Sequence, residues 1–301
     1  MSAWSARPPA GRVAYVNGAY LAHGRAAVHI EDRGLQFADS IYEVFGVADG
    51  RLLDEEEHFE RLARSLREIA MAEPMAPAAL RFVLREITRR NRVRDGLVYL
   101  QVTRGALRRD HAIPKNSPKP TLIVTARSLD PAVQERRKET GVAVISLPDL
   151  RWGRCDIKST ALLPNILAKS AARDAGAFEA WLVDAQGFVT EGSSTTAWIV
   201  DEQGRVITRG LSEAVLPGVT RRVMMKALAE AQIAVEERAF TLEEAGRARE
   251  AFISAATLGA TPVVSIDGRK LGDGTPGPLT RRIQALYAQS AAKGAGSLKE
   301  F

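Results

Sequence analysis

The sequence has little cysteine and no long apolar run. Cys155 is the only cysteine among 301 residues, which excludes an intramolecular disulfide framework. No segment approaches the ~18 consecutive apolar residues of a membrane-spanning helix. Residues 1–18 contain two arginines but no apolar stretch of the kind found in secretory signals. We therefore expect a soluble, cytoplasmic protein with no membrane partner.

Short signatures of several common sites are also missing. The chain contains no CxxC, HExxH or GxxxxGK[ST] pattern, so metal and P-loop sites have no motif support. The histidines, His23, His29, His58 and His111, are scattered along the chain. A hydrolase of the Ser-His-Asp type lacks its GxSxG elbow. We expect no metal.

Positive charge is in excess, with a formal net charge of +6 and a pI of about 9.6. Arginine is concentrated in residues 81–94, but apolar residues from Leu80 to Ile87 recur there at helical spacing. The arginines then fall mostly on the other faces of that helix, and no aromatic residues are interleaved with them. We interpret the run as a solvated helix face and expect no nucleic-acid partner.

The order of predicted elements indicates an α+β protein of two domains. Strand-like runs come first, helices follow, and strands return before the pattern restarts, which differs from a parallel βαβ series. A polar segment at residues 131–140 is typical of a linker. The predicted divisions are a smaller domain at 1–130, the linker at 131–140, a larger domain at 141–288 and a flexible tail at 289–301.

Local patterns place the elements within these domains. Asn17-Gly18 and Asp49-Gly50 are hairpin signals between strand-like runs. Residues 97–105 and 120–128 form a further predicted strand pair. Helices are predicted over residues 54–69, 77–92, 164–175, 219–231, 242–246 and 280–288.

Several motifs occur in a fixed order along the chain. They are FADSIYEVF (37–45), EHFERL (57–62), TRGALRRDH (103–111), RCDIKSTALLPNILAKSAA (154–172), FVTEGSSTTAWIV (188–200), AVLPGVTRRVM (214–224) and FISAATLGATPV (252–263). Together they resemble the class IV aminotransferases, the branched-chain type of fold type IV, over roughly residues 12 to 285. The resemblance implies a two-domain fold with pyridoxal 5'-phosphate at the domain junction.

The resemblance also assigns the central residues. Lys158, in the DIKS motif, matches the lysine that holds the cofactor as a Schiff base and moves the substrate proton. A lysine withdrawn from water disfavours its charged form, and the free amine is the nucleophile. Glu191, in VTEGSS, matches the carboxylate that keeps the pyridine nitrogen protonated.

The phosphate group is expected to bind at an arginine and a helix start. Arg61, in EHFERL, matches the family's phosphate arginine and offers a fork of donors. Gly218, Val219 and Thr220 stand at a predicted helix start, where unpaired N–H groups favour an anion. Where the family often has a threonine this chain has Ala256, so Thr257, one place on, is the expected contact.

The substrate class follows from the segment TRGALRRDHAIP. It resembles the RxH element of the D-amino acid aminotransferases, in which arginine and histidine hold the substrate carboxylate with a tyrosine. The matching residues are Arg109, His111 and Tyr42, with Arg109 favoured over Arg108 by the RxH spacing. The expected reaction moves the amino group of a D-amino acid such as D-alanine to a 2-oxo acid by ping-pong kinetics.

Alternative functions remain open on the sequence alone. The same fold serves R-selective amine transaminases, L-branched-chain transaminases and aminodeoxychorismate lyases. A basic binding protein without turnover is a more distant alternative, which the pairing of Lys158 with Glu191 argues against. The resemblance further implies a homodimer whose active sites borrow residues from the partner subunit, with Arg109 and His111 as candidates.

Overall fold

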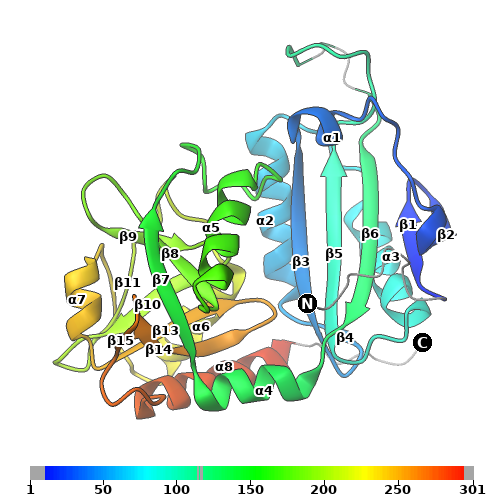
Figure 1. Cartoon of the computed structure of the whole chain (residues 1–301). Helices are drawn as coiled ribbons and strands as arrows, with labels where there is room; N and C mark the ends of the chain where they lie inside the picture. Colours follow the sequence, from blue (N-terminus) through cyan, green and yellow to red (C-terminus); the bar gives the residue numbers. More distant parts are fainter. Residues whose placement is uncertain (1–10, 114, 116–117, 295–301) are drawn as a thin grey trace. The chain divides into compact units, whose positions relative to one another are not determined.

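The computed structural model describes residues 11–113, 115 and 118–294. The chain divides into two compact units (Figure 1). Unit 1 comprises Met1–Leu129 together with Lys158–Ala161, and unit 2 comprises Asp130–Ile157 and Leu162–Phe301. Both units combine helices with largely antiparallel sheets, as expected for an α+β protein.

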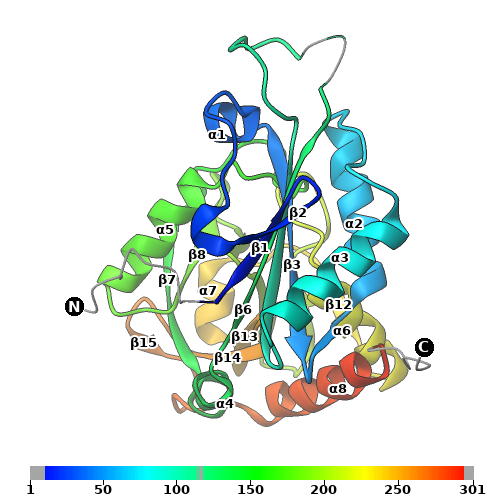
Figure 2. The same ribbon diagram turned by 90° about the vertical axis from the view of Figure 1, so that its right-hand side faces the viewer.

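Unit 1 is built on a six-stranded antiparallel sheet with the order β2-β1-β6-β5-β3-β4. The strands are β1 (Val13–Val16), β2 (Ala19–Ala22), β3 (Ser40–Ala48), β4 (Arg51–Leu52), β5 (Gly96–Thr103) and β6 (Thr121–Ser128). The helices are the 3-10 turn η1 (His23–Arg25), α1 (Arg33–Phe37), α2 (Glu55–Glu68) and α3 (Pro77–Arg90). Helices α2 and α3 cover one face of the sheet by contacting β3 and β6 respectively (Figure 2).

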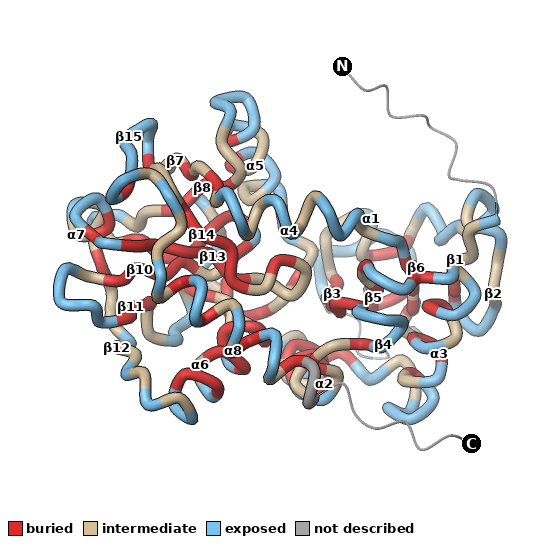
Figure 3. Tube along the Cα trace, turned by 90° about the horizontal axis from the view of Figure 1, so that it is seen from below, coloured by how far each residue is buried: buried red, intermediate tan, exposed pale blue. Residues whose placement is uncertain are grey.

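Strand β3 shows how the two faces of this sheet differ. Ile41, Glu43 and Phe45 are buried, whereas Tyr42 and Val44 between them are only half-buried. Successive side chains of a strand point to opposite faces, so Glu43 lies on the face covered by α2 and Tyr42 on the other. Figure 3 shows the buried positions concentrated in β3, β5 and β6 of this unit.

Unit 2 holds a nine-stranded mixed sheet with the order β12-β11-β10-β13-β14-β7-β8-β9, and β15 pairs with β14. Its strands are β7 (Val142–Pro148), β8 (Glu179–Val183), β9 (Val189–Gly192), β10 (Thr196–Val200), β11 (Val206–Thr208), β12 (Val235–Glu237), β13 (Glu250–Ala255), β14 (Gly259–Ile266) and β15 (Arg269–Lys270). Its helices are α4 (Pro131–Thr140), α5 (Leu163–Asp174), α6 (Val219–Glu230), α7 (Leu242–Arg247) and α8 (Pro278–Gly294). Trp181 and Phe240 are fully buried in its main core.

Three sequence expectations differ from the structure. The segment expected as a linker is helix α4, which belongs to unit 2 and contacts β14. Asp130 caps its first turn and Pro131 starts it, but α4 buries no residue, so no apolar periodicity revealed the helix. Helix α8 continues to Gly294, so the expected tail is helical over 289–294, while residues 295–301 lie outside the described part. Lys158–Ala161, assigned to the second domain, belongs to unit 1.

The arginine-rich helix α3 is a solvated amphipathic helix, as its sequence predicts. Leu80, Val83, Leu84 and Ile87 are buried on one side. The arginines on its other faces pair with glutamates. Arg81 pairs with Glu55 and Glu56 of α2 and Arg85 with Glu55, while Arg89 and Arg90 pair with Glu86. Much of the local positive charge is therefore neutralised within unit 1.

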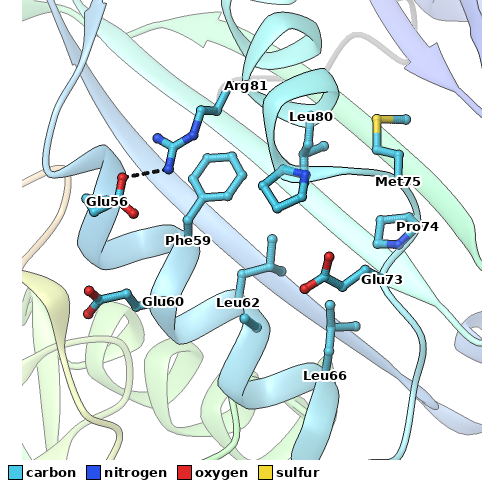
Figure 4. Close-up of a pocket in the computed structure, with 12 residues that line it drawn as sticks. Glu56, Phe59, Glu60, Leu62, Leu66, Glu73, Pro74, Met75, Leu80 and Arg81 are labelled. Carbon is cyan, nitrogen blue, oxygen red and sulfur yellow. Dashed lines mark hydrogen bonds and ion pairs between the residues drawn. The ribbon is translucent and has the colours of Figure 1, made fainter.

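A small cleft lies between α2 and α3. Its volume is about 220 Å³, and its walls are mainly apolar, including Phe59, Leu62, Leu66 and Leu80 (Figure 4). Arg81 lies over the ring of Phe59 and bonds to Glu56 at its margin. None of the residues predicted to bind cofactor or substrate lines this cleft.

A buried carboxylate fixes the loop between β9 and β10. Glu179 is fully buried at the start of β8, and its carboxylate accepts hydrogen bonds from the hydroxyls of Ser193, Ser194 and Thr195. The ammonium of Lys169 lies 3.4 Å from the same carboxylate. Because this loop follows Glu191 directly, Glu179 anchors the end of β9 that carries the predicted cofactor-binding glutamate.

Replacing Glu179 is therefore expected to destabilise unit 2. In Glu179→Ala the buried hydroxyls of Ser193 and Thr195, the exposed hydroxyl of Ser194 and an ammonium lose their acceptor. The free energy of unfolding should therefore fall by about 3 kcal/mol. Urea unfolding measures this change. Glu202→Ala, at an exposed turn of the same unit, serves as the control and should alter the value by less than about 0.5 kcal/mol. Equal losses in the two variants would contradict the anchoring role.

Candidate active site

Lys158 is held beside β3 of unit 1 by main-chain pairing. Its carbonyl accepts from the N–H of Tyr42 at 2.9 Å, and the N–H of Thr160 donates to the carbonyl of Ser40 at 3.1 Å. Ser159 forms a bridge with Ile41 between these bonds. The segment thus acts as a short additional strand. It places the half-buried Lys158 side chain with Nζ 4.1 Å from the ring centroid of Tyr42.

Tyr42 stands on the half-exposed face of the sheet among other polar side chains. Its ring lies 5.8 Å from that of Tyr99, measured between centroids. The Tyr99 hydroxyl donates to Gln101, whose amide donates to the hydroxyl of Ser40. Burial, reinforced by Tyr42, raises the pKa of Tyr99 to about 12, so its hydroxyl stays protonated at neutral pH. Unit 1 therefore presents an amine and a phenol side by side on a polar face.

Arg61 is bound to a buried carboxylate on the opposite face. Its Nε and one Nη each donate to Glu43 at 2.8 Å, and His58 Nδ1 lies 2.7 Å from the same carboxylate. Burial alone would raise the pKa of Glu43, but Arg61 and His58 together hold it well below its ordinary value. Burial lowers the pKa of His58, and the positive charges of Arg61 and Lys158 add to this effect. Glu43 therefore fixes the orientation of the predicted phosphate arginine.

Arg109 and His111 lie together on an exposed loop of unit 1. The guanidinium carbon of Arg109 is 5.0 Å from the ring centroid of Phe37, and the His111 ring is 5.3 Å from the same centroid. Arg33 bonds to the carbonyls of Asp110 and His111, which fixes the loop backbone. Within the described part of this unit, no hydrogen bond, ion pair or ring contact joins either residue to Tyr42.

Glu191 is buried at the end of β9 in unit 2. One of its oxygens bonds to Nη1 of Arg151, and the N–H of Leu216 lies 3.2 Å and 3.3 Å from its two oxygens. Arg151 also bonds to both oxygens of Asp149 at 2.7 Å and 2.9 Å and to the carbonyl of Ala214 at 3.0 Å. Glu191 is thus tied to the segment that leads into α6.

The start of α6 has the form of an anion site. Gly218 is its N-cap without a side-chain cap, and its first turn contains no acidic residue. The hydroxyl of Thr220 is buried, and it has no hydrogen-bond partner among the described residues. A Cβ at Gly218 would lie 3.1 Å from the hydroxyl oxygen of Thr196, so only glycine fits there easily. Unpaired N–H groups at a helix start and an unpartnered hydroxyl suit a phosphate.

Two further residues discussed in the sequence analysis are Thr257 and Cys155. Thr257 is half-buried in the turn between β13 and β14. Cys155 is buried, its thiol bonds to the carbonyl of Trp152, and burial raises its pKa to about 11. Such a thiol is a filler, as the sequence indicates, rather than a nucleophile.

Sequence reasoning missed Arg151 as part of the site. It lies in the polar stretch after β7, where an arginine resembles any other loop arginine. Its partner Asp149 is two residues away, but Glu191 is distant in the sequence. Only the folded arrangement reveals it. The motif match predicted Glu191, but Arg151, which pairs with it, lies in no sequence motif.

The donor set fits pyridoxal phosphate at both ends. In unit 2 the buried cluster of Asp149, Arg151 and Glu191 has two carboxylates for one guanidinium, which leaves a need for a cation such as a protonated ring nitrogen. The unpartnered Thr220 hydroxyl at the start of α6 suits a phosphate. Among the described residues, no cluster of His, Cys, Asp or Glu is arranged to hold a metal ion, and no helix is long and apolar enough to cross a membrane.

Solved structures with the same fold are aminotransferases. The chain superposes on the branched-chain amino acid aminotransferase of Escherichia coli with a TM-score of 0.85 and 23% identity, covering 96% of this chain and 97% of that one. A pyridoxal-phosphate-bound aminotransferase from Mycobacterium tuberculosis, described as hypothetical, gives a TM-score of 0.80 at 22% identity, with 93% and 98% coverage. At these identities the likeness establishes the fold, which confirms the fold type IV expectation.

Sequence relatives add the family. The D-alanine aminotransferase of Bacillus licheniformis is 39% identical over 274 residues, covering 91% of this chain and 95% of the relative. That of Staphylococcus haemolyticus is 37% identical over 271 residues, with 90% and 94% coverage. The profile of the family described as "Amino-transferase class IV" matches residues 40–266. With this match and these relatives, the chain belongs to the class IV aminotransferases.

Proposed function

We propose that the protein is a pyridoxal-phosphate-dependent D-amino acid transaminase, which moves the amino group of a D-amino acid such as D-alanine to a 2-oxo acid such as 2-oxoglutarate or pyruvate. The observation that carries the proposal is the position of Lys158, whose amine lies 4.1 Å from the ring of Tyr42 on the half-exposed face of unit 1. Relatives named D-alanine aminotransferase, 36–39% identical over about nine-tenths of the chain, support the substrate class.

The residues divide the work as follows. When bound, the cofactor supplies an electrophilic carbon and an electron-withdrawing ring. Lys158 holds it covalently and, once displaced by substrate, takes the proton from the substrate Cα as a general base. Glu191 keeps the ring nitrogen protonated. Arg61, Gly218, Val219 and Thr220 bind the phosphate, with Thr257 as a further contact.

The substrate carboxylate is recognised by charge-assisted donors. Arg109 and His111 are exposed on their loop, and both lie near the ring of Phe37. A guanidinium and an imidazole fixed side by side suit a carboxylate, and Tyr42 adds a phenol. As in the family that the chain resembles, we propose that Arg109 and His111 are donated to the active site of a partner subunit.

A homodimer accounts for a second feature of the surface. Leu163, Ile166 and Leu167 occupy one face of α5 at i, i+3 and i+4, and each is more than half exposed. Contiguous exposed apolar side chains mark an interaction surface, and Figure 3 shows exposed positions alternating with more buried ones along this helix. We propose that a second copy of the chain covers this face of α5. We also propose that the protein acts in the cytoplasm.

The proposed function is tested by the visible spectrum of the purified protein without acceptor. The band of the bound cofactor should be lost fastest on addition of D-alanine, compared with L-leucine or an R-arylalkylamine. Faster loss with L-leucine or the amine would keep the cofactor and overturn the substrate class. A protein that pyridoxal phosphate cannot colour would overturn the proposal as a whole.

The carboxylate role of Arg109 is tested against its neighbour. Arg109→Ala should lower kcat/KM for D-alanine by about a hundredfold, because a charge-assisted pair worth about 3 kcal/mol is lost. Activity on an amine without a carboxylate should change little. Arg108→Ala, also exposed on the same loop, is the control and should match the wild type. Equal losses for both substrates in Arg109→Ala would place the carboxylate contact elsewhere.

The phosphate role of Thr220 is tested with an isosteric change. Thr220→Val removes an unpartnered buried hydroxyl, so the apoprotein should be no less stable, while the dissociation constant of pyridoxal phosphate should rise about tenfold. Thr280→Val is a matched control, since the Thr280 hydroxyl is also buried without a partner among the described residues. Thermal unfolding and cofactor titration measure the two effects. Unchanged cofactor affinity in Thr220→Val would remove this residue from the phosphate site.

A further inference from the structure

The carboxylate of Glu191 shares one guanidinium with a second carboxylate. Arg151 directs Nη1 to Glu191, while its Nε and Nη2 bond to the two oxygens of Asp149. The three side chains are nearly buried, with exposed fractions of 6% for Arg151, 9% for Glu191 and 11% for Asp149. The hydroxyl of Thr190 also donates to Asp149 at 2.7 Å. A single arginine therefore bridges two acids within unit 2.

The charge of this cluster is unbalanced by one negative unit. In a buried site two carboxylates cannot both stay ionised without compensation. Arg151 stabilises the negative charge of Asp149 more than that of Glu191, since it holds the pKa of Asp149 below the ordinary value against the effect of burial. Burial raises the pKa of Glu191, and Arg151 offsets this only in part. The balance at Glu191 thus depends on how the arginine divides its charge.

The other groups that face Glu191 are few. The N–H of Leu216 donates to its carboxylate, and Thr190, beside it on β9, bonds to Asp149. Cys155 is coupled to the same cluster, but burial raises its pKa to about 11, so it is uncharged at neutral pH. Arg151 and Asp149 are therefore the charged residues of the cluster around Glu191.

We propose that Arg151 and Asp149 act as positioning residues that set the ionisation of Glu191 and thereby the protonation of the cofactor ring nitrogen. This inference rests on the proposed function, because Glu191 must face that nitrogen. Arg151 lowers the basicity of Glu191, so the shared proton stays on the nitrogen. Asp149 competes with Glu191 for the charge of Arg151 and so weakens the effect of the arginine on the basicity of Glu191. The pair adjusts how strongly the ring withdraws electrons.

The direction of each substitution follows from the charges. In Arg151→Gln the two acids face each other without a cation, Glu191 becomes more basic, and the shared proton moves from the ring nitrogen to the carboxylate. In Asp149→Asn the arginine serves Glu191 alone and the cluster loses one negative charge, so the nitrogen gives up its proton at lower pH than in the wild type. In the double variant both opposing charges are gone, and the proton returns to the nitrogen.

The experiment measures the protonation of the ring nitrogen directly. Each variant is reconstituted with pyridoxal phosphate labelled with ¹⁵N in the ring, and the nitrogen resonance, which moves upfield on protonation, is followed against pH. Arg151→Gln should show a neutral nitrogen at neutral pH and a fall in kcat for D-alanine of about tenfold or more, the equivalent of one pKa unit. The KM for D-alanine should change little, because Arg151 does not touch the substrate carboxylate.

A double variant distinguishes an electrostatic role of Arg151 from a structural one. Asp149→Asn added to Arg151→Gln should restore the protonated resonance and most of kcat, whereas a purely structural arginine would make the double variant no better than the single. Arg154→Gln is the control, since Arg154 pairs with Asp156 in the same stretch and should leave the resonance unchanged. If Arg151→Gln does not fold, Asp149→Asn alone decides, and a titration identical to the wild type overturns the proposal.

Failure of the proposed function and failure of this inference give different results. If the protein is not a pyridoxal-phosphate enzyme, the wild type binds no labelled cofactor and shows no nitrogen resonance. If only the substrate class is wrong, the wild type shows a nitrogen resonance but prefers another amino donor to D-alanine. If only the role of Arg151 and Asp149 is wrong, the wild type shows a protonated nitrogen and Arg151→Gln shows the same.

Discussion

The main-chain pairing of Lys158–Thr160 with β3 is the constraint on which the account depends. A lysine on an ordinary surface loop is a solvated ammonium with many rotamers. Here two backbone hydrogen bonds and a bridge make its segment an extra strand beside Tyr42. The amine is thereby fixed against an aromatic ring by backbone geometry and not by a charged partner. A nucleophile needs such placement before its chemistry matters.

Each unit also contains a buried charge cluster. In unit 1, Glu43 binds His58 and Arg61 on the face covered by α2. In unit 2, Arg151 binds Asp149 and Glu191. The clusters differ in charge. In the first, Glu43 balances the guanidinium of Arg61 while the lowered pKa keeps His58 neutral. The second carries excess negative charge and suits a protonated nitrogen. Buried ions of this kind add little net stability, so function is the better reason for their presence.

Sequence motifs identified the family and the fold. They also predicted Lys158, Glu191 and Thr220 as site residues, because each lies in a local pattern. Helices with an apolar stripe, such as α2, α3 and α6, were also predictable, whereas α4 was not, since it buries no residue. The partners Arg151 and Asp149 could not be found in the same way. Their roles arise because Arg151, bound to Asp149, also contacts Glu191, which is distant along the chain and meets it only in the folded sheet. The roles of Arg109 and His111 were inferred from resemblance, and the structure adds their shared contact with Phe37.

The most direct measurement of the central claim is to identify the lysine that carries the cofactor. The purified holoenzyme is reduced with borohydride, which makes the linkage permanent, and is then digested and analysed by mass spectrometry. The account predicts that the cofactor mass is found on the peptide containing Lys158 and on no other. The same mass on the peptide of another lysine, such as Lys169, or on no peptide of a coloured protein, would contradict it.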